Sequence, residues 1–155
     1  MIRVLREGGQ IVAGIAFERY PRSDCGLVTY MVVAPSHRQR GLGLELQRAA
    51  VRELSARVVF GEVLPAKLER NLRWGARIVD LQYIQPALGP GLVRDRGLIL
   101  LALGGGEPLP DALPGDVVRA FLEELYTATE GGPLDPAIHI GPTVGLILAH
   151  PTAPG

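Results

Sequence analysis

Several features that would point to particular functions are scarce or missing in this chain. It has a single cysteine, Cys25, which excludes an internal disulfide and fits a reducing compartment such as the cytoplasm. Its formal net charge is zero, so no electrostatic footprint for nucleic acid or an acidic membrane surface stands out. The longest apolar runs, such as residues 98–103, are far below the roughly 18 residues of a membrane span. We therefore expect a cytoplasmic protein with neither nucleic-acid nor membrane partners.

Lysine is the scarcest charged residue, because Lys67 stands alone beside 15 arginines. Arginine is a planar donor suited to phosphates and carboxylates. The two histidines of the C-terminal tail, His139 and His150, are too far apart for a recognised metal-ligand spacing, and we expect no metal site. Charged residues occur within the first seven positions, too early for the apolar core of a signal peptide. A length of 155 residues, 47% of them apolar, suits one well-buried domain.

The hydrophobic pattern predicts a mixed α/β domain. Strands are expected at residues 1–6, 10–20, 26–34, 57–64, 77–85 and 98–103. An amphipathic helix is expected from the glycine turn at 41–43 to about residue 55, and a shorter one at 65–74. Strand, helix and strand follow one another from residue 26 to 64, so these two strands should be close to parallel.

The last third of the chain has a different composition. Three glycines at 104–106 are followed by a proline-rich connector, and Asp116 is placed to cap a helix over 116–130. The tail, 138–149, is apolar but interrupted by glycine and proline, and the pattern assigns no structure to it. We therefore divide the chain into a core, residues 1–103, and an extension, residues 104–155, that packs on the core or on a partner.

A glycine-rich turn, Arg38-x-x-Gly41-x-Gly43, separates the strongest strand from the strongest helix. Backbone N–H groups in such a turn and at a helix N-terminus attract anions, and arginine side chains add charge-assisted donors. The turn therefore predicts a pyrophosphate site, and an ordinary glycine turn with solvated arginines is the alternative. It is not a Walker A sequence, because no Gly-Lys-Ser/Thr follows, and Leu46 stands where a dinucleotide fingerprint needs its third glycine.

Residues 32–43, Val-Val-Ala-Pro-Ser-His-Arg-Gln-Arg-Gly-Leu-Gly, resemble the acetyl-CoA-binding motif of the GNAT superfamily of N-acyltransferases. That motif is a strand ending in V-x-P, then Q/R-x-x-G-x-G/A, then a helix. The resemblance covers roughly residues 1–103. It implies a GNAT-like α/β (α+β) fold, with a mixed and largely antiparallel sheet, flanking helices, and two central parallel strands, 27–34 and 58–64, that splay apart to admit the cofactor.

The resemblance begins after the family's usual N-terminal strand and two helices, which commonly form one wall of the acceptor pocket. The chain instead carries about fifty residues beyond the last family strand. We expect the helix 116–130 and the tail to fill the missing wall, either in the same chain or from the partner in a homodimer.

The resemblance also implies acetyl-CoA as acyl donor and the amine of a small molecule as acceptor, with direct attack of that amine on the thioester. The first strand of the splayed pair would bind the pantetheine arm, and the glycine turn would bind the pyrophosphate. The cofactor-binding residues implied in this way are Met31, Val32, Val33, Arg38, Gln39, Arg40, Gly41, Leu42, Gly43 and Leu44.

The family's usual catalytic residues are not matched. Asn71 stands where a tyrosine acid is frequent, and Leu64 aligns near a frequent asparagine. Substitutes are available on the predicted strands: Glu62 and Glu18 as bases, Tyr83 and Tyr30 as acids, with Gln85 as a further acceptor contact. Solvated carboxylates and packed tyrosines are the alternatives. Two further functions stay open beside an active N-acetyltransferase, namely a non-catalytic CoA-binding or regulatory module and a purely structural dimer.

Overall fold

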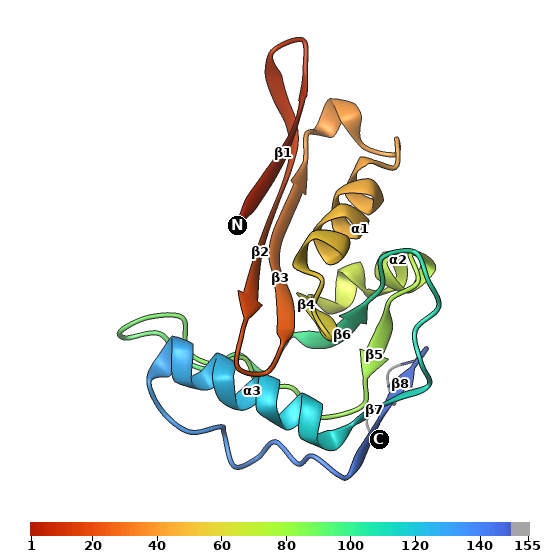
Figure 1. Ribbon diagram of the computed structural model, residues 1–155. Coiled ribbons are helices and arrows are strands. Elements are labelled where there is room, and N and C mark those ends of the chain that lie inside the picture. Colours follow the sequence, from red (N-terminus) through yellow and green to blue (C-terminus); the bar gives the residue numbers. More distant parts are fainter. Residues whose placement is uncertain (150–155) are drawn as a thin grey trace.

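A computed structural model describes residues 1–149 of the chain, so residues 150–155, with His150 and the end of the predicted extension, lie outside the described residues. One eight-stranded sheet runs through the molecule in the order β1-β2-β3-β4-β6-β5-β8-β7 (Figure 1). The strands are β1 (Ile2–Glu7), β2 (Gln10–Tyr20), β3 (Cys25–Val33), β4 (Val58–Val63), β5 (Arg77–Val79), β6 (Ile99–Leu103), β7 (Ala112–Pro114) and β8 (Thr143–Ile147). The helices are α1 (Leu42–Leu54), α2 (Leu68–Arg73) and α3 (Gly115–Glu130), with 3-10 turns η1 (Pro35–His37) and η2 (Pro65–Lys67).

The pairing of β3 with β4 is the only parallel one among the described strand pairs, and the rest are antiparallel. This mixed α/β sheet with flanking helices confirms the predicted fold class. Cys25–Val28 pair with Val58–Gly61, and the two strands separate beyond that point. A β-bulge lies at the same level, because Ala16 pairs with Tyr30 while Phe17 pairs with Val28, leaving Thr29 as the extra residue. Bulges bend a strand and increase its twist, which accounts for the divergence of β3 from β4.

Helices cover both faces of the sheet. Helix α1 buries Leu46, Ala50 and Leu54, which recur every four residues, against β2 and β3 on one face. Helix α3 lies across the other face near the β2–β3 turn (Figure 1). There Phe121 stacks on Phe60 with ring centroids 4.3 Å apart and meets the edge of Tyr20 at 5.7 Å. The C-terminal helix therefore packs on the sheet of its own chain.

The prediction of a strand over 77–85 is wrong beyond Val79. The backbone bends at Asp80, whose N–H donates to the carbonyl of Gly145, and the chain continues irregularly to β6. The hydrophobic pattern of 81–84 comes from burial rather than strand pairing, because Tyr83 and Ile84 are buried under α3.

The extension contains two strands that the sequence did not reveal. Strand β7 lies in the proline-rich connector, and β8 lies in the unassigned tail, where it pairs with both β5 and β7. The predicted cap of α3 is also wrong. Pro114 occupies the N-cap position without a side-chain hydrogen bond, and Asp116 lies in the first turn, where a carboxylate still favours the helix dipole. Within residues 1–149, no helix is long and apolar enough to cross a membrane.

Candidate functional site

The glycine-rich turn joins β3 to α1. Gly41, the N-cap of α1, has φ +76°, and Gln39 has φ +66°. Left-handed backbone is natural for glycine but uncommon for glutamine, and such conformations concentrate at ligand sites. Since the first N–H groups of a helix have no partner inside the helix, those of α1 are available to an anion.

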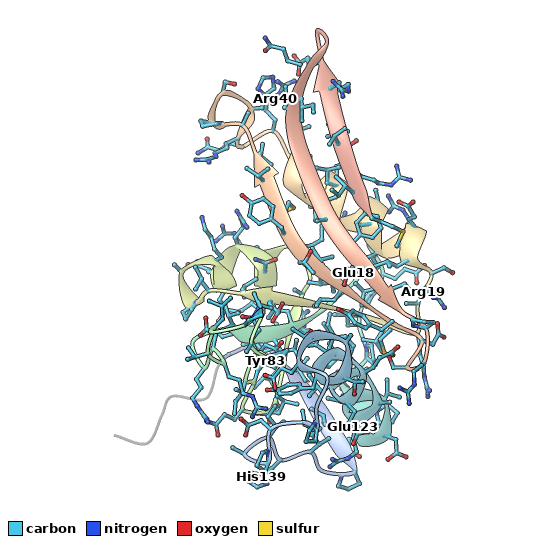
Figure 2. The ribbon with its side chains drawn as sticks, turned by 90° about the vertical axis from the view of Figure 1, so that its left-hand side faces the viewer. Glu18, Arg19, Arg40, Tyr83, Glu123 and His139 are labelled. Atoms are coloured by element: carbon cyan, nitrogen blue, oxygen red, sulfur yellow. The ribbon has the colours of Figure 1, made fainter. Side chains whose placement is uncertain are left out.

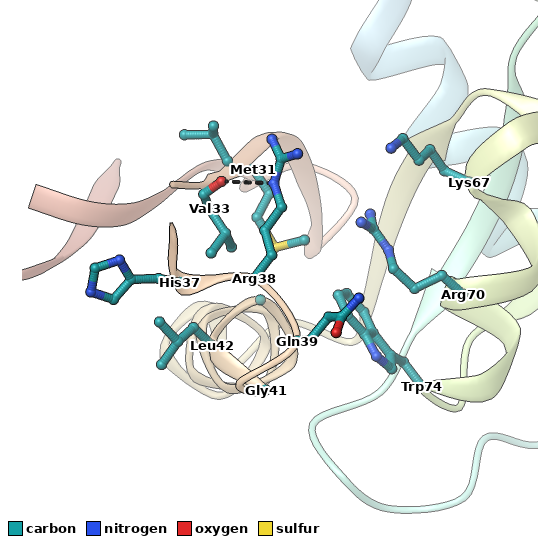
Figure 3. A pocket seen from close by; sticks show the side chains of 12 residues that line it. Met31, Val33, His37, Arg38, Gln39, Gly41, Leu42, Lys67, Arg70 and Trp74 are labelled. Atoms are coloured by element: carbon teal, nitrogen blue, oxygen red, sulfur yellow. Dashed lines mark hydrogen bonds between the residues drawn. The ribbon is translucent and has the colours of Figure 1, made fainter. Parts of the chain in front are cut away.

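A cleft of about 510 Å³ opens beside this turn (Figure 3). Most of the predicted cofactor-binding residues line it: Met31, Val32, Val33, Arg38, Gln39, Gly41, Leu42 and Gly43. Arg40 and Leu44 are not among the lining residues. The Arg40 guanidinium lies 3.3 Å from the carboxylate of Glu7, which also lies 3.1 Å from His37 Nε2.

The opposite wall of the cleft comes from the segment around α2. Lys67, Arg70 and Trp74 line it, and Figure 3 shows them facing Arg38 and Gln39 across the opening. The Arg70 guanidinium lies 4.8 Å from the centroid of the Trp74 ring. Sequence reasoning missed these three residues as site residues. Their signal was available in part, because two cations and an aromatic ring follow at spacings of three and four residues on a predicted helix.

At Gly43 the first wall lies close to Trp74 of the second. A Cβ atom added to Gly43 would lie 2.9 Å from Cη2 of Trp74 and 3.4 Å from the terminal methyl of Met31. A side chain at position 43 would therefore displace the Trp74 ring. The second glycine of the motif thus has a packing reason, whereas the first, Gly41, has a conformational one.

The gap between the separated ends of β3 and β4 forms a second recess of about 310 Å³. Met31, Lys67 and Arg70 line both this recess and the cleft, so the two are contiguous. Glu62, on β4, lines the recess just beyond the last paired residue, Gly61. The recess therefore joins a candidate phosphate site to a carboxylate at the point of divergence.

Glu62 is held by two hydrogen bonds. The Tyr83 hydroxyl donates to Glu62 Oε2 at 2.6 Å, and Gln85 Nε2 donates to the same oxygen at 2.9 Å. Burial raises the pKa of the Glu62 carboxyl above its ordinary value, while these two hydrogen bonds act in the opposite direction. Burial and the nearby Glu62 charge also raise the pKa of Tyr83, which therefore remains a neutral donor. Two candidates that the sequence left separate thus form one cluster.

The Tyr83–Gln85 segment is fastened to α3. The Tyr126 hydroxyl donates to the carbonyl of Ile84 at 2.6 Å. Arg94 forms a bidentate pair with Glu130 at 2.7 and 2.9 Å and reaches Asp135 at 2.7 Å. These contacts tie the loop between β5 and β6 to the C-terminal helix, and so help to fix the Glu62 cluster.

The remaining candidates lie in different surroundings. Glu18 accepts a hydrogen bond from Tyr20 at 3.0 Å near α3 (Figure 2). Tyr30 is 65% exposed on β3, where it lines the recess without a hydrogen bond to Glu62. Asn71 is buried and bonded to Gln47 and to the carbonyl of Lys67, whereas Leu64 is exposed at the start of η2. Asn71 and Leu64 both line the recess, but neither side chain can act as an acid there.

Metal ligands are not gathered in the described part of the chain. No group of three or more His, Cys, Asp or Glu side chains suited to a metal ion occurs within residues 1–149. His139 lies in the tail, at the opposite end of the molecule from Arg40 (Figure 2).

Residues 1–69 match the sequence model of the acetyltransferase (GNAT) family. This part of the chain, somewhat less than half of it, is similar to the GNAT family. The match contains β1 to β4, the glycine-rich turn, α1 and Glu62, so it covers the first wall of the cleft and one side of the recess. It confirms the resemblance drawn from residues 32–43.

Solved GNAT structures share the fold. A GNAT-family protein from Desulfovibrio desulfuricans matches with a TM-score of 0.52 at 16% identity, over 67% of each chain. A GNAT acetyltransferase from Elizabethkingia anophelis with acetyl-CoA bound matches with a TM-score of 0.51 at 15% identity, over 66% of this chain and 74% of that one. A Bacillus subtilis acetyltransferase in complex with CoA matches with a TM-score of 0.50 at 14% identity, over 66% and 75%.

Proposed function

We propose that this protein is an acetyl-CoA-dependent N-acetyltransferase that transfers the acetyl group directly to an amine. The observation that carries the proposal is the continuity of the glycine-turn cleft with the recess between β3 and β4, where Glu62 lies. An anion site and a half-buried carboxylate would then lie at the two ends of one path. The GNAT match of residues 1–69 and the acetyl-CoA and CoA complexes of its structural neighbours support the choice of donor.

The cleft suits the polar half of acetyl-CoA. We assign the pyrophosphate to the N-terminus of α1 with Arg38, and the remaining anionic charge to Lys67 and Arg70 on the opposite wall. The free edge of β3 over Met31–Val33 would receive the pantetheine arm as an added strand. That arm would carry the thioester into the recess that Glu62 lines.

Glu62 is assigned as the general base. An amine is mostly an ammonium at neutral pH and must lose a proton before its nitrogen attacks the thioester carbonyl carbon. Glu62 would take that proton, the C–N bond would form, and the C–S bond would break to release the CoA thiolate. The second proton that the nitrogen loses on becoming an amide would neutralise the thiolate. A carboxyl pKa raised by burial is better matched to this task than an ordinary one.

Tyr83 and Gln85 are assigned as positioning residues. Both donate hydrogen bonds to a single oxygen, Oε2, of Glu62. This would leave Oε1 as the oxygen that receives the proton. Tyr83 thus orients the base, in place of the acid role that its residue type also allows.

The test is acetyl transfer by the wild-type protein and by Glu62→Gln over a panel of amines, followed as release of free CoA thiol. Loss of the base should lower kcat by about 10²- to 10⁴-fold, while calorimetry gives an unchanged Kd for acetyl-CoA. The Glu123→Gln variant is the matched control, because it removes an exposed carboxylate on α3 that lies outside the recess lining. Equal rates for wild type and Glu62→Gln would exclude the assigned base.

A non-catalytic CoA-binding or regulatory module is the second candidate, favoured by Asn71 in the place of the frequent tyrosine acid. Tight acetyl-CoA binding without thiol release on any amine would establish it. Absence of acetyl-CoA binding would exclude both candidates and leave a structural role.

A further inference from the structure

The outer part of the β1–β2–β3 ribbon carries a helix on one side only. Helix α1 covers the face that contains Leu5, Ile15 and Met31 (Figure 1). Among the described residues, no helix or strand packs over the opposite face of this part of the sheet. An apolar groove of about 370 Å³ lies there, which we call the open-face groove.

The strand register builds this groove from rows of large, small and large side chains. One row is Ile2, Ala16 and Tyr30, and the next is Val4, Gly14 and Val32. The two small residues of β2 form a floor between walls from β1 and β3. Ile2 is 76% exposed and Tyr30 is 65% exposed, so the walls present apolar surface to solvent.

The charges around the groove are unevenly distributed. None of the residues that line it is Asp, Glu, Lys, Arg or His. Carboxylates occur at one end, where Glu18 follows Ala16 by two residues on the same face of β2 and Glu62 lines the adjoining recess. Tyr30 lines both the groove and the recess, and therefore connects them.

We infer that the acceptor is an amine with an uncharged apolar body, which lies in the open-face groove while its ammonium group faces the Glu62 recess. This inference rests on the proposed function and names the substrate class of the same site. Apolar lining favours a body that loses little hydration on burial, whereas a second charge at the far end would have to be desolvated. The carboxylates at the near end favour the ammonium group.

The test uses straight-chain amines from propylamine to hexylamine, with 1,6-diaminohexane as a length-matched compound that carries a second charge. For the wild-type protein, kcat/KM should rise roughly threefold to fourfold for each added methylene, as full burial of that group predicts. Hexylamine should exceed 1,6-diaminohexane by at least about tenfold, because the groove offers no partner for the second ammonium.

Gly14→Val narrows the groove without an evident clash. A Cβ atom at Gly14 would lie 3.6 Å from the carbonyl oxygen of Arg3 and 3.7 Å from a methyl of Val4, both ordinary contacts. Valine also suits a strand. This variant should flatten the dependence of kcat/KM on chain length, so that hexylamine loses its advantage over propylamine. Gly132→Val adds the same side chain where nothing lies within 4 Å, and should leave the dependence unchanged.

Hexylamine binding to the protein with CoA, measured by calorimetry, separates failure of the inference from failure of the proposed function. Binding that Gly14→Val weakens, without turnover, would support the groove and reject the acetyltransferase. Turnover with no gain along the series, or with 1,6-diaminohexane equal to hexylamine, would overturn the inference and keep the acetyltransferase. A dimer that Gly14→Val dissociates, with the length dependence unchanged, would overturn it too, since the groove would then be a subunit interface.

Discussion

At the scale of single residues, the Glu62 cluster turns an ordinary carboxylate into a candidate base by surroundings alone. Burial disfavours the charged form, and hydrogen bonds from Tyr83 and Gln85 favour it. The sequence supplied Glu62 and Tyr83 as separate candidates, because both residue types suit proton transfer. It could not supply their contact, which depends on the irregular path of residues 80–98 beneath the sheet.

Replacement of Tyr83 by phenylalanine should move the pH dependence of acetyl transfer. The hydroxyl stabilises the charged carboxylate, so its removal raises the pKa of Glu62. Since the base must be ionised to act, the acidic limb of the kcat/KM profile should shift to higher pH in Tyr83→Phe. Tyr20→Phe is the control, because the Tyr20 hydroxyl donates to Glu18 instead. An unshifted limb in Tyr83→Phe would remove Tyr83 from the proposed mechanism.

Gly43→Ala should weaken acetyl-CoA binding without weakening the fold. The added methyl would lie 2.9 Å from the Trp74 ring and must displace it from the cleft wall. Alanine is also the better helix former, so stability should be kept. Calorimetry should give a roughly tenfold higher Kd for acetyl-CoA, on the order of 1.4 kcal/mol. Gly132→Ala, in open surroundings, should match wild type; a Kd that is unchanged in Gly43→Ala would contradict the role given to Trp74.

At the scale of elements, the local hydrophobic pattern predicted most strands of the sheet. It failed for the segments whose structure depends on packing against distant parts of the chain. Strand β2 matches its predicted bounds, 10–20, and α1 ends one residue before the predicted position. Both have a clear period and end at a turn or a left-handed residue. Strand β8 has no such signal, because Gly145 interrupts it and its partners β5 and β7 lie far away in the sequence. The wall formed by Arg70 and Trp74 was missed because its position opposite the glycine-rich turn depends on packing, which the spacing on the helix does not show.

Arg94 should matter more to stability at neutral pH than in acid. Its hydrogen bonds help to lower the pKa of Glu130 to about 2 and that of Asp135 below its ordinary value. A depressed carboxyl pKa contributes stability above the ordinary pKa, and this contribution disappears as the pH falls through the folded-state value. The Tm of Arg94→Ala should therefore lie below wild type above about pH 5, and the difference should close near pH 2.

Thermal unfolding followed by circular dichroism across this pH range is the measurement. Arg119→Ala is the control, because Arg119 forms an exposed pair with Glu123 at 3.9 Å and should change Tm little at any pH. A constant difference in Tm between Arg94→Ala and wild type down to pH 2 would show that Arg94 acts through its contact with the Tyr126 ring. Its ion pairs with Glu130 and Asp135 would then contribute nothing measurable.

At the scale of the whole molecule, residues 1–103 and 104–155 differ in composition, but the described residues of both parts share one hydrophobic core. One hydrophobic cluster unites Leu27, Phe60 and Leu100 with Phe121 and Tyr126 of α3. We propose that the two parts unfold together as one cooperative unit.

The Phe121→Ala variant tests whether the two parts unfold in one cooperative transition. The side chain is fully buried against Phe60, so its loss should cost about 3–5 kcal/mol. Trp74 is the only tryptophan, and it reports on the N-terminal part, whereas circular dichroism also reports on α3. Denaturant midpoints from both probes should fall together in Phe121→Ala, and Glu123→Ala on the exposed side of α3 should leave them in place. Separate midpoints would establish two units.

The position of the single lysine has a practical consequence for covalent chemistry. Lys67 is exposed and lines both the cleft and the recess. Reagents that modify primary amines therefore have only two targets among the described residues, namely the α-amino group of Met1 and the side chain of Lys67. Mass-spectrometric footprinting of Lys67, with the N-terminus as internal reference, can report occupancy of the cleft without any engineered label.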